Sequence, residues 1–143
     1  MIWAETLPFF ARAELACRHC GTIRMDHRFA AALPYLRLTW GRPLKLTSVC
    51  RCPAHNVASK GHPTSMHLTV NPKYPDLSGT AAADIYWEDW NPADQEKFYN
   101  HAWSLGWACG LHDTFLHVDR RSIVGKPQLT FLYGEWNGTF KTH

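Results

Sequence analysis

The sequence predicts an α+β fold: a single domain with a small, mainly antiparallel sheet and flanking helices. Two observations support this prediction. Two segments repeat apolar residues at helical spacing, and four short segments carry the apolar patterns of strands. These segments follow one another in mixed order. The length of 143 residues suits one domain with its own core, so residues 1–143 are expected to form a single unit.

The first helix is predicted over residues 26–40. Apolar residues recur at helical spacing between Phe29 and Leu36, and Asp26 can cap the start of the helix. Pro34 conflicts with an uninterrupted helix. The helix is therefore expected either to kink at Pro34 or to end there, with Pro34 opening a second piece.

A strand is predicted over residues 44–49, where apolar and polar residues alternate. Residues 56–80 show little periodicity and many small or polar residues, which predicts a long surface loop carrying His67. Residues 81–87 return to an apolar strand pattern that contains Asp84. This part of the chain therefore alternates short strands with one long loop.

The second helix is predicted to begin at Asn91, since an Asn cap followed by Pro92 is a strong start signal. It is expected to end before Gly106. Two further strands are predicted at residues 115–119 and 129–133, separated by a turn.

Composition excludes few functions. The chain has 45% hydrophobic residues but no apolar run long enough to span a membrane, so no membrane insertion is expected. A net charge of +3 suits many kinds of partner.

Residues 1–10 lack the pattern of a secretory signal, so synthesis in a cytoplasm is expected. The oligomeric state is not readable from the sequence, and a monomer is the default.

Five cysteines do not form a complete disulfide set, which favours reduced thiols. Cys17 and Cys20 are separated by two residues, and Cys50 and Cys52 by one. These four cysteines could hold a structural zinc ion. The single-residue spacing is tighter than that of the usual zinc knuckle, however, and ordinary burial is the preferred interpretation.

Three residues invite a functional interpretation, although each has a plain structural one. A lone histidine such as His67 is usually just solvated. Asp84 lies within an apolar strand, where a buried carboxylate needs a cation or hydrogen-bond donors. His117 and Asp119 are two residues apart on a strand, so their side chains share a face and could form a buried pair.

Taken together, four sequence blocks resemble one family. They are TSVCRCPAHN at residues 47–56, SMH at 65–67, GTAAADI at 79–85 and FLHVD at 115–119. In this order they resemble the zinc D-Ala-D-Ala carboxypeptidases, which include phage L-alanyl-D-glutamate endolysins and share a Hedgehog-like zinc peptidase fold. The resemblance extends over most of the chain, roughly residues 9 to 121.

The resemblance implies that His67, Asp84 and His117 bind one catalytic zinc ion. Three protein ligands leave a fourth position open for water, which becomes a nucleophile near neutral pH. Arg51 is then expected to bind a substrate carboxylate or carbonyl through its planar guanidinium group, which can donate two hydrogen bonds to a carboxylate. Ser65 is expected to hold the substrate or to order the loop that carries His67.

The general base is less directly implied. Family members place an acid three residues before the last histidine, where this chain has Thr114. Asp113, one residue earlier, is the predicted base that takes a proton from water and passes it to the leaving amine. His112 is predicted to stabilise the oxyanion. Asp119 is the competing carboxylate, although orienting a ligand or Arg51 is its preferred role.

The interval between His67 and Asp84 is longer than is usual in the family, and residues 68–78 read as an insertion beside the cleft. Such an insertion could shape substrate choice or could simply be a tolerated surface excursion.

The function implied is therefore that of a zinc metallopeptidase that cuts a stem peptide or cross-link of bacterial peptidoglycan. A phage endolysin, released through a holin or delivered by a virion to the cell wall, is the expected context. A non-catalytic zinc module on the same scaffold is the alternative. A zinc protein that binds nucleic acid would need a coherent basic and aromatic face, of which Arg120, Arg121 and Lys126 give only a hint, so no nucleic-acid partner is expected.

Overall fold

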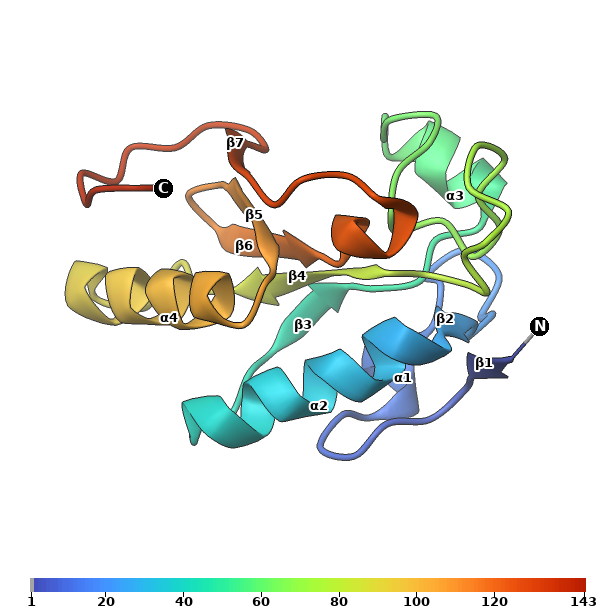
Figure 1. Ribbon diagram of the computed structural model, residues 1–143, viewed down its shortest axis with the longest axis horizontal. Helices are drawn as coiled ribbons and strands as arrows, with labels where there is room; N and C mark the ends of the chain where they lie inside the picture. Colours follow the sequence, from blue (N-terminus) through green and yellow to red (C-terminus); the bar gives the residue numbers. More distant parts are fainter. Residues whose placement is uncertain (1) are drawn as a thin grey trace.

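The computed structural model describes residues 2–143 as an α+β fold (Figure 1). Its centre is a five-stranded sheet in the order β3-β4-β6-β5-β7, in which only the β5–β7 pair is parallel. A separate pair of strands, β1 and β2, is antiparallel. The strands are β1 Trp3–Ala4, β2 Met25–Asp26, β3 Leu46–Ser48, β4 Ala82–Tyr86, β5 Ala108–Leu111, β6 Phe115–Asp119 and β7 Thr130–Leu132. The predicted fold class is confirmed.

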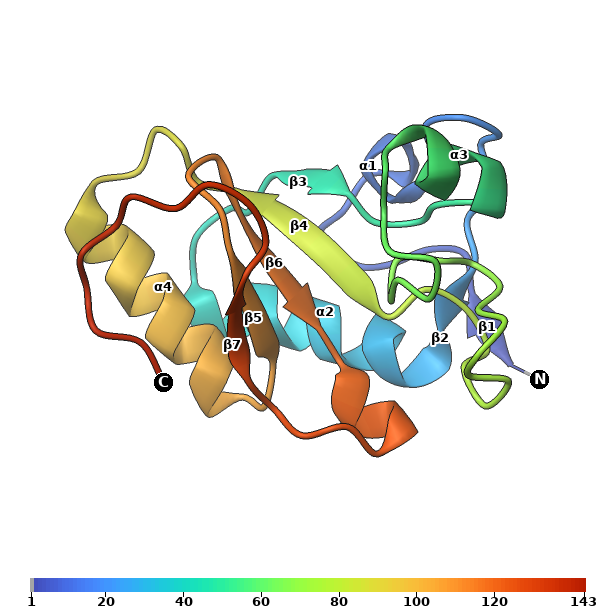
Figure 2. The ribbon, with the colours of Figure 1, turned by 90° about the horizontal axis from the view of Figure 1, so that it is seen from above.

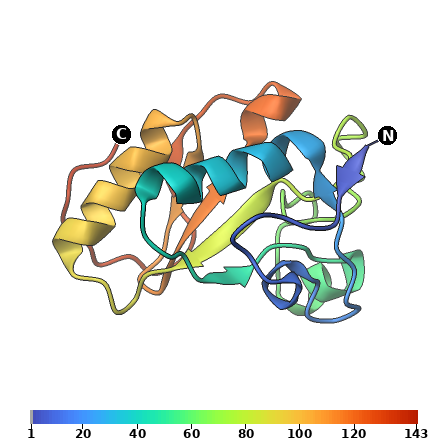
Figure 3. The same ribbon diagram turned by 90° about the horizontal axis from the view of Figure 1, so that it is seen from below.

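Two long helices, α2 and α4, lie over one face of the sheet (Figure 3). The opposite face carries the loop that follows α3 and the C-terminal part of the chain (Figure 2). The helices are α1 Arg12–Leu15, α2 His27–Trp40, α3 Pro53–Ala58, α4 Pro92–Ser104 and the 3₁₀-helix η1 Arg121–Val124. Within residues 2–143 no helix has both the length and the apolar character needed to cross a bilayer.

Helix α2 begins where the sequence predicts. Asp26 caps it, because its carboxylate accepts a hydrogen bond from the backbone N–H of Arg28 at 2.9 Å. The helix continues through Pro34, so its division into two pieces is not observed. It closes at Gly41, whose φ of 80° is the left-handed conformation that glycine adopts most readily. The buried face of α2 packs onto the sheet.

Helix α4 matches its prediction closely. The side chain of Asn91 accepts a hydrogen bond from the N–H of Asp94 at 2.9 Å, and Pro92 occupies the first turn. Phe98 and Ala102 lie on its buried face. Strand β5, in contrast, has no counterpart in the sequence prediction, because Ala108–Leu111 is buried at every position and shows no alternation.

The prediction of a surface loop over residues 56–80 is wrong in several places, two of which bear on the site. Helix α3 takes up its first residues, and the stretch from Ser65 to Thr69 is buried. Backbone hydrogen bonds explain the burial: the N–H of Arg51 donates to the carbonyl of His67, and the N–H of Thr69 donates to the carbonyl of Arg51, both at 3.0 Å. The segment that carries His67 therefore runs beside Arg51, inside the fold.

Candidate metal centre

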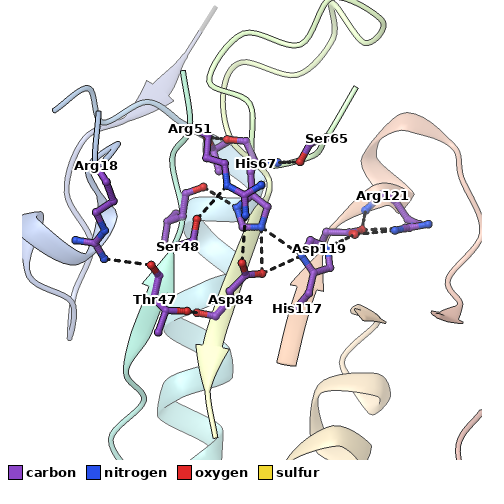
Figure 4. Close-up of polar contacts among 12 residues, drawn as sticks. Arg18, Thr47, Ser48, Arg51, Ser65, His67, Asp84, His117, Asp119 and Arg121 are labelled. Atoms are coloured by element: carbon purple, nitrogen blue, oxygen red, sulfur yellow. Dashed lines mark hydrogen bonds and ion pairs between the residues drawn. The ribbon is translucent and has the colours of Figure 1, made fainter. Parts of the chain in front are cut away.

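The side chains of His67, Asp84 and His117 meet at one point (Figure 4). His67 comes from the buried segment after α3, Asp84 from β4 and His117 from β6. Asp84 Oδ1 lies 3.1 Å from His67 Nε2 and 3.0 Å from His117 Nδ1, and the two nitrogens are 3.3 Å apart. The prediction that these three residues gather is confirmed.

Strand alternation places Asp84 at this point. Its neighbours Ala83 and Ile85 are fully buried in the hydrophobic core, so the carboxylate of Asp84 projects from the other face of β4. Asp84 pairs with His117 in the register of β4 and β6, which sets their side chains side by side. An apolar strand thus presents one charged group to the site.

His67 is oriented by the backbone. Its Nδ1 lies 2.8 Å from the carbonyl oxygen of Val49, which can only accept, so Nδ1 carries the hydrogen. Nε2 is then left with a lone pair directed at Asp84. Burial lowers the pKa of His67 against the opposing effect of Asp84, which favours the neutral form that binds metals.

His117 is oriented by a carboxylate. Its Nε2 donates to Asp119 Oδ2 at 2.8 Å, which leaves Nδ1 facing Asp84. Asp119 is fully buried and also accepts three hydrogen bonds from Arg121, through the backbone N–H, Nε and Nη2. The ring of Tyr133 stacks on the imidazole, with centroids 4.3 Å apart. Asp119 therefore holds His117 in place, which is the ligand-orienting role predicted for it.

Protonation within the cluster is strongly coupled. Burial acts to raise the pKa of Asp84, but the charges and hydrogen bonds of His67 and His117 outweigh it and lower that pKa. Burial acts to lower the pKa of His117, and hydrogen bonds with Asp119 and Asp84 raise it to about 9. A proton on His117 Nδ1 would thus compete with a cation for the same lone pair.

The donor atoms fit a zinc ion. Two imidazole nitrogens and one carboxylate oxygen are a ligand set that catalytic zinc sites use, and each histidine has its second nitrogen engaged by an acceptor. The three atoms converge within 3.3 Å of one another. The residues present are therefore those expected to hold one Zn²⁺.

The triad opens into a cavity of about 600 Å³. Asp84 and His117 line it, and Arg51, Ser65 and Tyr133 surround them. The remaining lining is largely basic or aromatic and comprises Lys60, His62, Tyr74, Phe115, Arg121, Lys126 and Phe131, with Asp119, Met66, Thr64, Gly61 and Ser59. The space is large enough for a peptide segment.

Arg51 lies beside the triad, as predicted. Its Nη2 donates to Asp84 Oδ2 at 3.3 Å and its Nε to Ser48 Oγ at 3.2 Å, while Cys52 begins the turn into α3. Only 7% of Arg51 is exposed, so its guanidinium is held in a fixed direction. Ser65 accepts a hydrogen bond from the N–H of His67 at 3.2 Å and also lines the cavity.

Asp113 and His112 are placed differently from the other predicted residues. Neither lines the cavity. The carboxylate of Asp113 accepts hydrogen bonds from the backbone N–H and the side-chain amide of Asn137, at 2.7 and 2.6 Å. His112 stacks on Phe115 and accepts a hydrogen bond from the N–H of Thr114. Their catalytic roles stay predictions.

Most of the residues that line the cavity have no site role in the sequence prediction, and two tyrosines among them bear directly on its geometry. Tyr133 stacks on a proposed ligand, and Tyr74 comes from the insertion at residues 68–78, which confirms that the insertion lies beside the cleft. Arg121 enters the sequence prediction only as part of a basic patch. Its position two residues after Asp119, from which its backbone N–H and its side chain can both donate to that carboxylate, is the signal that could have identified it.

The cysteines separate into two groups. Cys17, Cys20 and Cys52 bring their sulfur atoms within 4.8 Å of one another. Cys50 does not join them, because its thiol is buried and donates to the carbonyl of Arg24 at 3.7 Å. The four-cysteine cluster, which the sequence left as the less favoured alternative to burial, is not observed, and three of these four cysteines gather instead.

Comparison with protein families gives a match to Peptidase M15 over residues 8–119, more than half of the chain. The chain belongs to the peptidase M15 family. This M15 metallopeptidase carries the buried His-Asp-His triad expected of a zinc site, and the four sequence blocks that suggested the family fall within or at the edge of the matched region. Searches of curated proteins and of solved structures gave no significant match.

Proposed function

We propose that this M15 peptidase hydrolyses a peptide bond in the stem peptide or cross-link of bacterial peptidoglycan, with one zinc ion at the triad. The observation that carries the proposal is the convergence of His67, Asp84 and His117 beside a cavity that Asp84 and His117 line, in a chain of this family. A zinc ion held there would polarise the scissile carbonyl and lower the pKa of water.

Arg51 and Tyr133 are proposed to bind the carbonyl oxygen as it becomes negative. Both line the cavity next to Asp84. Burial, assisted by the charge of Asp84, raises the pKa of Tyr133, so its hydroxyl stays protonated and can donate a hydrogen bond. Because Arg51 is already fixed by Ser48 and Asp84, its donors require little reorganisation during the reaction.

The proton of the attacking water needs an acceptor. Asp113 remains the proposed base because it is the acid next to Thr114, which holds the family's acid position, although its carboxylate is bound by Asn137 and does not line the cavity. Two carboxylates do line the cavity, but both already have partners. Asp84 belongs to the triad, and Asp119 accepts hydrogen bonds from His117 and Arg121. His62, an exposed residue of the cavity, is a second acceptor that merits testing.

The charge of the cavity supports a substrate rich in carboxylates. Lys60, Arg121 and Lys126 line it together with Arg51. Peptidoglycan stem peptides carry free carboxylates on D-glutamate and at their C-terminus, which such cations can bind.

Mass spectrometry of digested peptidoglycan tests the proposal and names the bond. Zinc-loaded protein should release new peptides, chelated protein should not, and zinc should restore the activity. His117→Ala should be inactive, whereas the matched control His143→Ala, which changes an exposed histidine outside the cavity, should be active. Binding to insoluble peptidoglycan without any product would instead support a non-catalytic module.

We further propose that the protein is an endolysin-like enzyme that reaches the cell wall through a holin or a virion. This proposal rests on the resemblance to phage endolysins. It predicts that the protein lyses cells when a secretion signal directs it to the periplasm but not when it stays in the cytoplasm. Lysis in neither compartment by an enzyme active on purified peptidoglycan would contradict it.

A further inference from the structure

A second cluster of metal-binding residues lies outside the catalytic cavity. Cys17 follows α1, Cys20 lies three residues further on, and Cys52 directly precedes α3. The turn that follows α1 and the residue before α3 are far apart in the sequence but meet at this cluster. The three sulfur atoms lie within 4.8 Å of one another, and none of these residues lines the cavity.

The backbone around Cys17 forms a tight turn of the type that presents two sulfurs to one ion. The N–H of Cys17 donates to the carbonyl of Thr22 at 2.9 Å, and the N–H of Gly21 donates to the carbonyl of Cys17 at 2.8 Å. Gly21 has a φ of 76°, a conformation that glycine adopts without strain. Cys17 and Cys20 are thus held on one side of the turn.

Backbone N–H groups are directed at the sulfur atoms. The N–H of Cys52 donates to Cys17 Sγ at 3.3 Å, and the N–H of His55 donates to Cys52 Sγ at 3.4 Å. Such donors stabilise negative charge on sulfur, and the thiolate is the form that binds a metal. All five cysteines of the described residues 2–143 are free thiols. Three thiols gathered in this way are better explained by an ion than by a single disulfide, which would leave one sulfur unused.

Two histidines can complete the set. His19 Nδ1 lies 3.5 Å from Cys52 Sγ, and the ring of His55 lies 6.5 Å from that of His19. His55 also follows Cys52 with the same two-residue spacing that separates Cys17 from Cys20. Three cysteines and one histidine in paired spacing of this kind are typical of structural zinc sites.

We propose that Cys17, Cys20 and Cys52, with the imidazole of His19 or His55, bind a second, structural Zn²⁺. This ion would join the N-terminal segment to the residue that follows Arg51. Since Arg51 exchanges backbone hydrogen bonds with His67 and Thr69, the link would also support the segment that carries a catalytic ligand. The inference does not depend on the peptidase activity, because it concerns metal content.

Metal content and cobalt spectroscopy test the proposal on the intact, reduced protein. The wild type should bind two equivalents of zinc. Replacement by Co²⁺ should produce the intense charge-transfer absorption of cobalt bound to several thiolates, which the His-Asp-His site cannot give because it contains no sulfur. His67→Ala/His117→Ala should keep one equivalent and the thiolate absorption.

Cys20→Ser, which changes an exposed residue, should lose one equivalent and the absorption, whereas the matched control Cys50→Ala should keep both. His19→Ala and His55→Ala should identify the fourth ligand by the change in the cobalt spectrum. Complete loss of zinc from folded, reduced His67→Ala/His117→Ala, or cobalt-loaded wild type without thiolate absorption, would overturn the proposal. So would a disulfide between two of the three cysteines that forms in the presence of zinc.

Discussion

Asp84 and His117 are direct register partners on neighbouring antiparallel strands, and Asp84 Oδ1 lies 3.0 Å from His117 Nδ1. Register partners in a buried sheet cannot move apart without breaking the pairing of β4 and β6. Two of the three proposed ligands are thus fixed by the sheet itself. The third, His67, is added from an irregular segment that backbone hydrogen bonds hold in place.

Asp119→Asn is expected to weaken both zinc affinity and activity. The amide keeps the size of the side chain but removes the charge that holds His117 Nε2 and Arg121. Loss of a partner that orients a metal ligand typically lowers affinity or activity about 10- to 100-fold. Zinc titration against a chelator and a kinetic assay on a stem peptide would measure the two effects. Asp94→Asn, in an exposed ion pair with Arg42, is the matched control and should change neither.

Arg51→Lys is expected to lower kcat/KM about 10- to 100-fold, because an ammonium group replaces a planar guanidinium that donates hydrogen bonds to Ser48 and Asp84 at the same time. The effect should grow with substrates that carry a free carboxylate near the cleaved bond. Kinetics on paired peptides, one with that carboxylate and one with its amide, would show this. Equal losses on both peptides would mean that Arg51 only supports Asp84.

The sequence predicts those parts of the fold that depend on interactions between residues close together in the chain. The caps and periodicity of α4 are contained in its own residues, and the placement of Asp84 and of the His117–Asp119 pair follows from the alternation of side chains along a strand. These features require no knowledge of distant contacts. They account for the two long helices, α2 and α4, for most of the central sheet and for two of the three proposed metal ligands.

The rest depends on packing between distant segments. The burial of His67 comes from the pairing of its segment with Arg51, and the stacking of Tyr133 on His117 comes from the parallel pairing of β7 with β5. Likewise, spacing alone could not show that Cys52, rather than Cys50, faces Cys17. These contacts depend on how the backbone segments that carry the residues are placed relative to one another in the folded protein.

Asp113→Ala and Asn137→Ala together test the proposed base. Asp113→Ala removes both hydrogen bonds with Asn137, whereas Asn137→Ala removes only the one from its side-chain amide, so the variants should lose about 2 and about 1 kcal/mol of stability. If Asp113 accepts the proton, only Asp113→Ala should also lose about 100- to 10,000-fold in kcat. Thermal unfolding and single-turnover kinetics would separate the two effects. Equal kcat values in the two variants would leave Asp113 a structural role and direct the search to His62.

The charge of Asp26 is expected to contribute to stability above about pH 4. Burial acts to raise the pKa of Asp26, but hydrogen bonds from Arg28 and Ser78 and the charge of Arg28 lower it to about 2 in the folded state. The group titrates in the unfolded chain near its ordinary value of 3.8. The contribution, about 2 kcal/mol, is thus complete above that value and is lost as the pH falls toward 2.

The difference in free energy of unfolding between the wild type and Asp26→Asn isolates this group from other carboxylates. It should be largest at neutral pH and shrink steadily between about pH 4 and pH 2. Urea unfolding at several pH values would measure it. A difference that does not change with pH would mean that the hydrogen bonds to Ser78 and Arg28, rather than the charge of Asp26, hold the start of α2 against the end of the insertion.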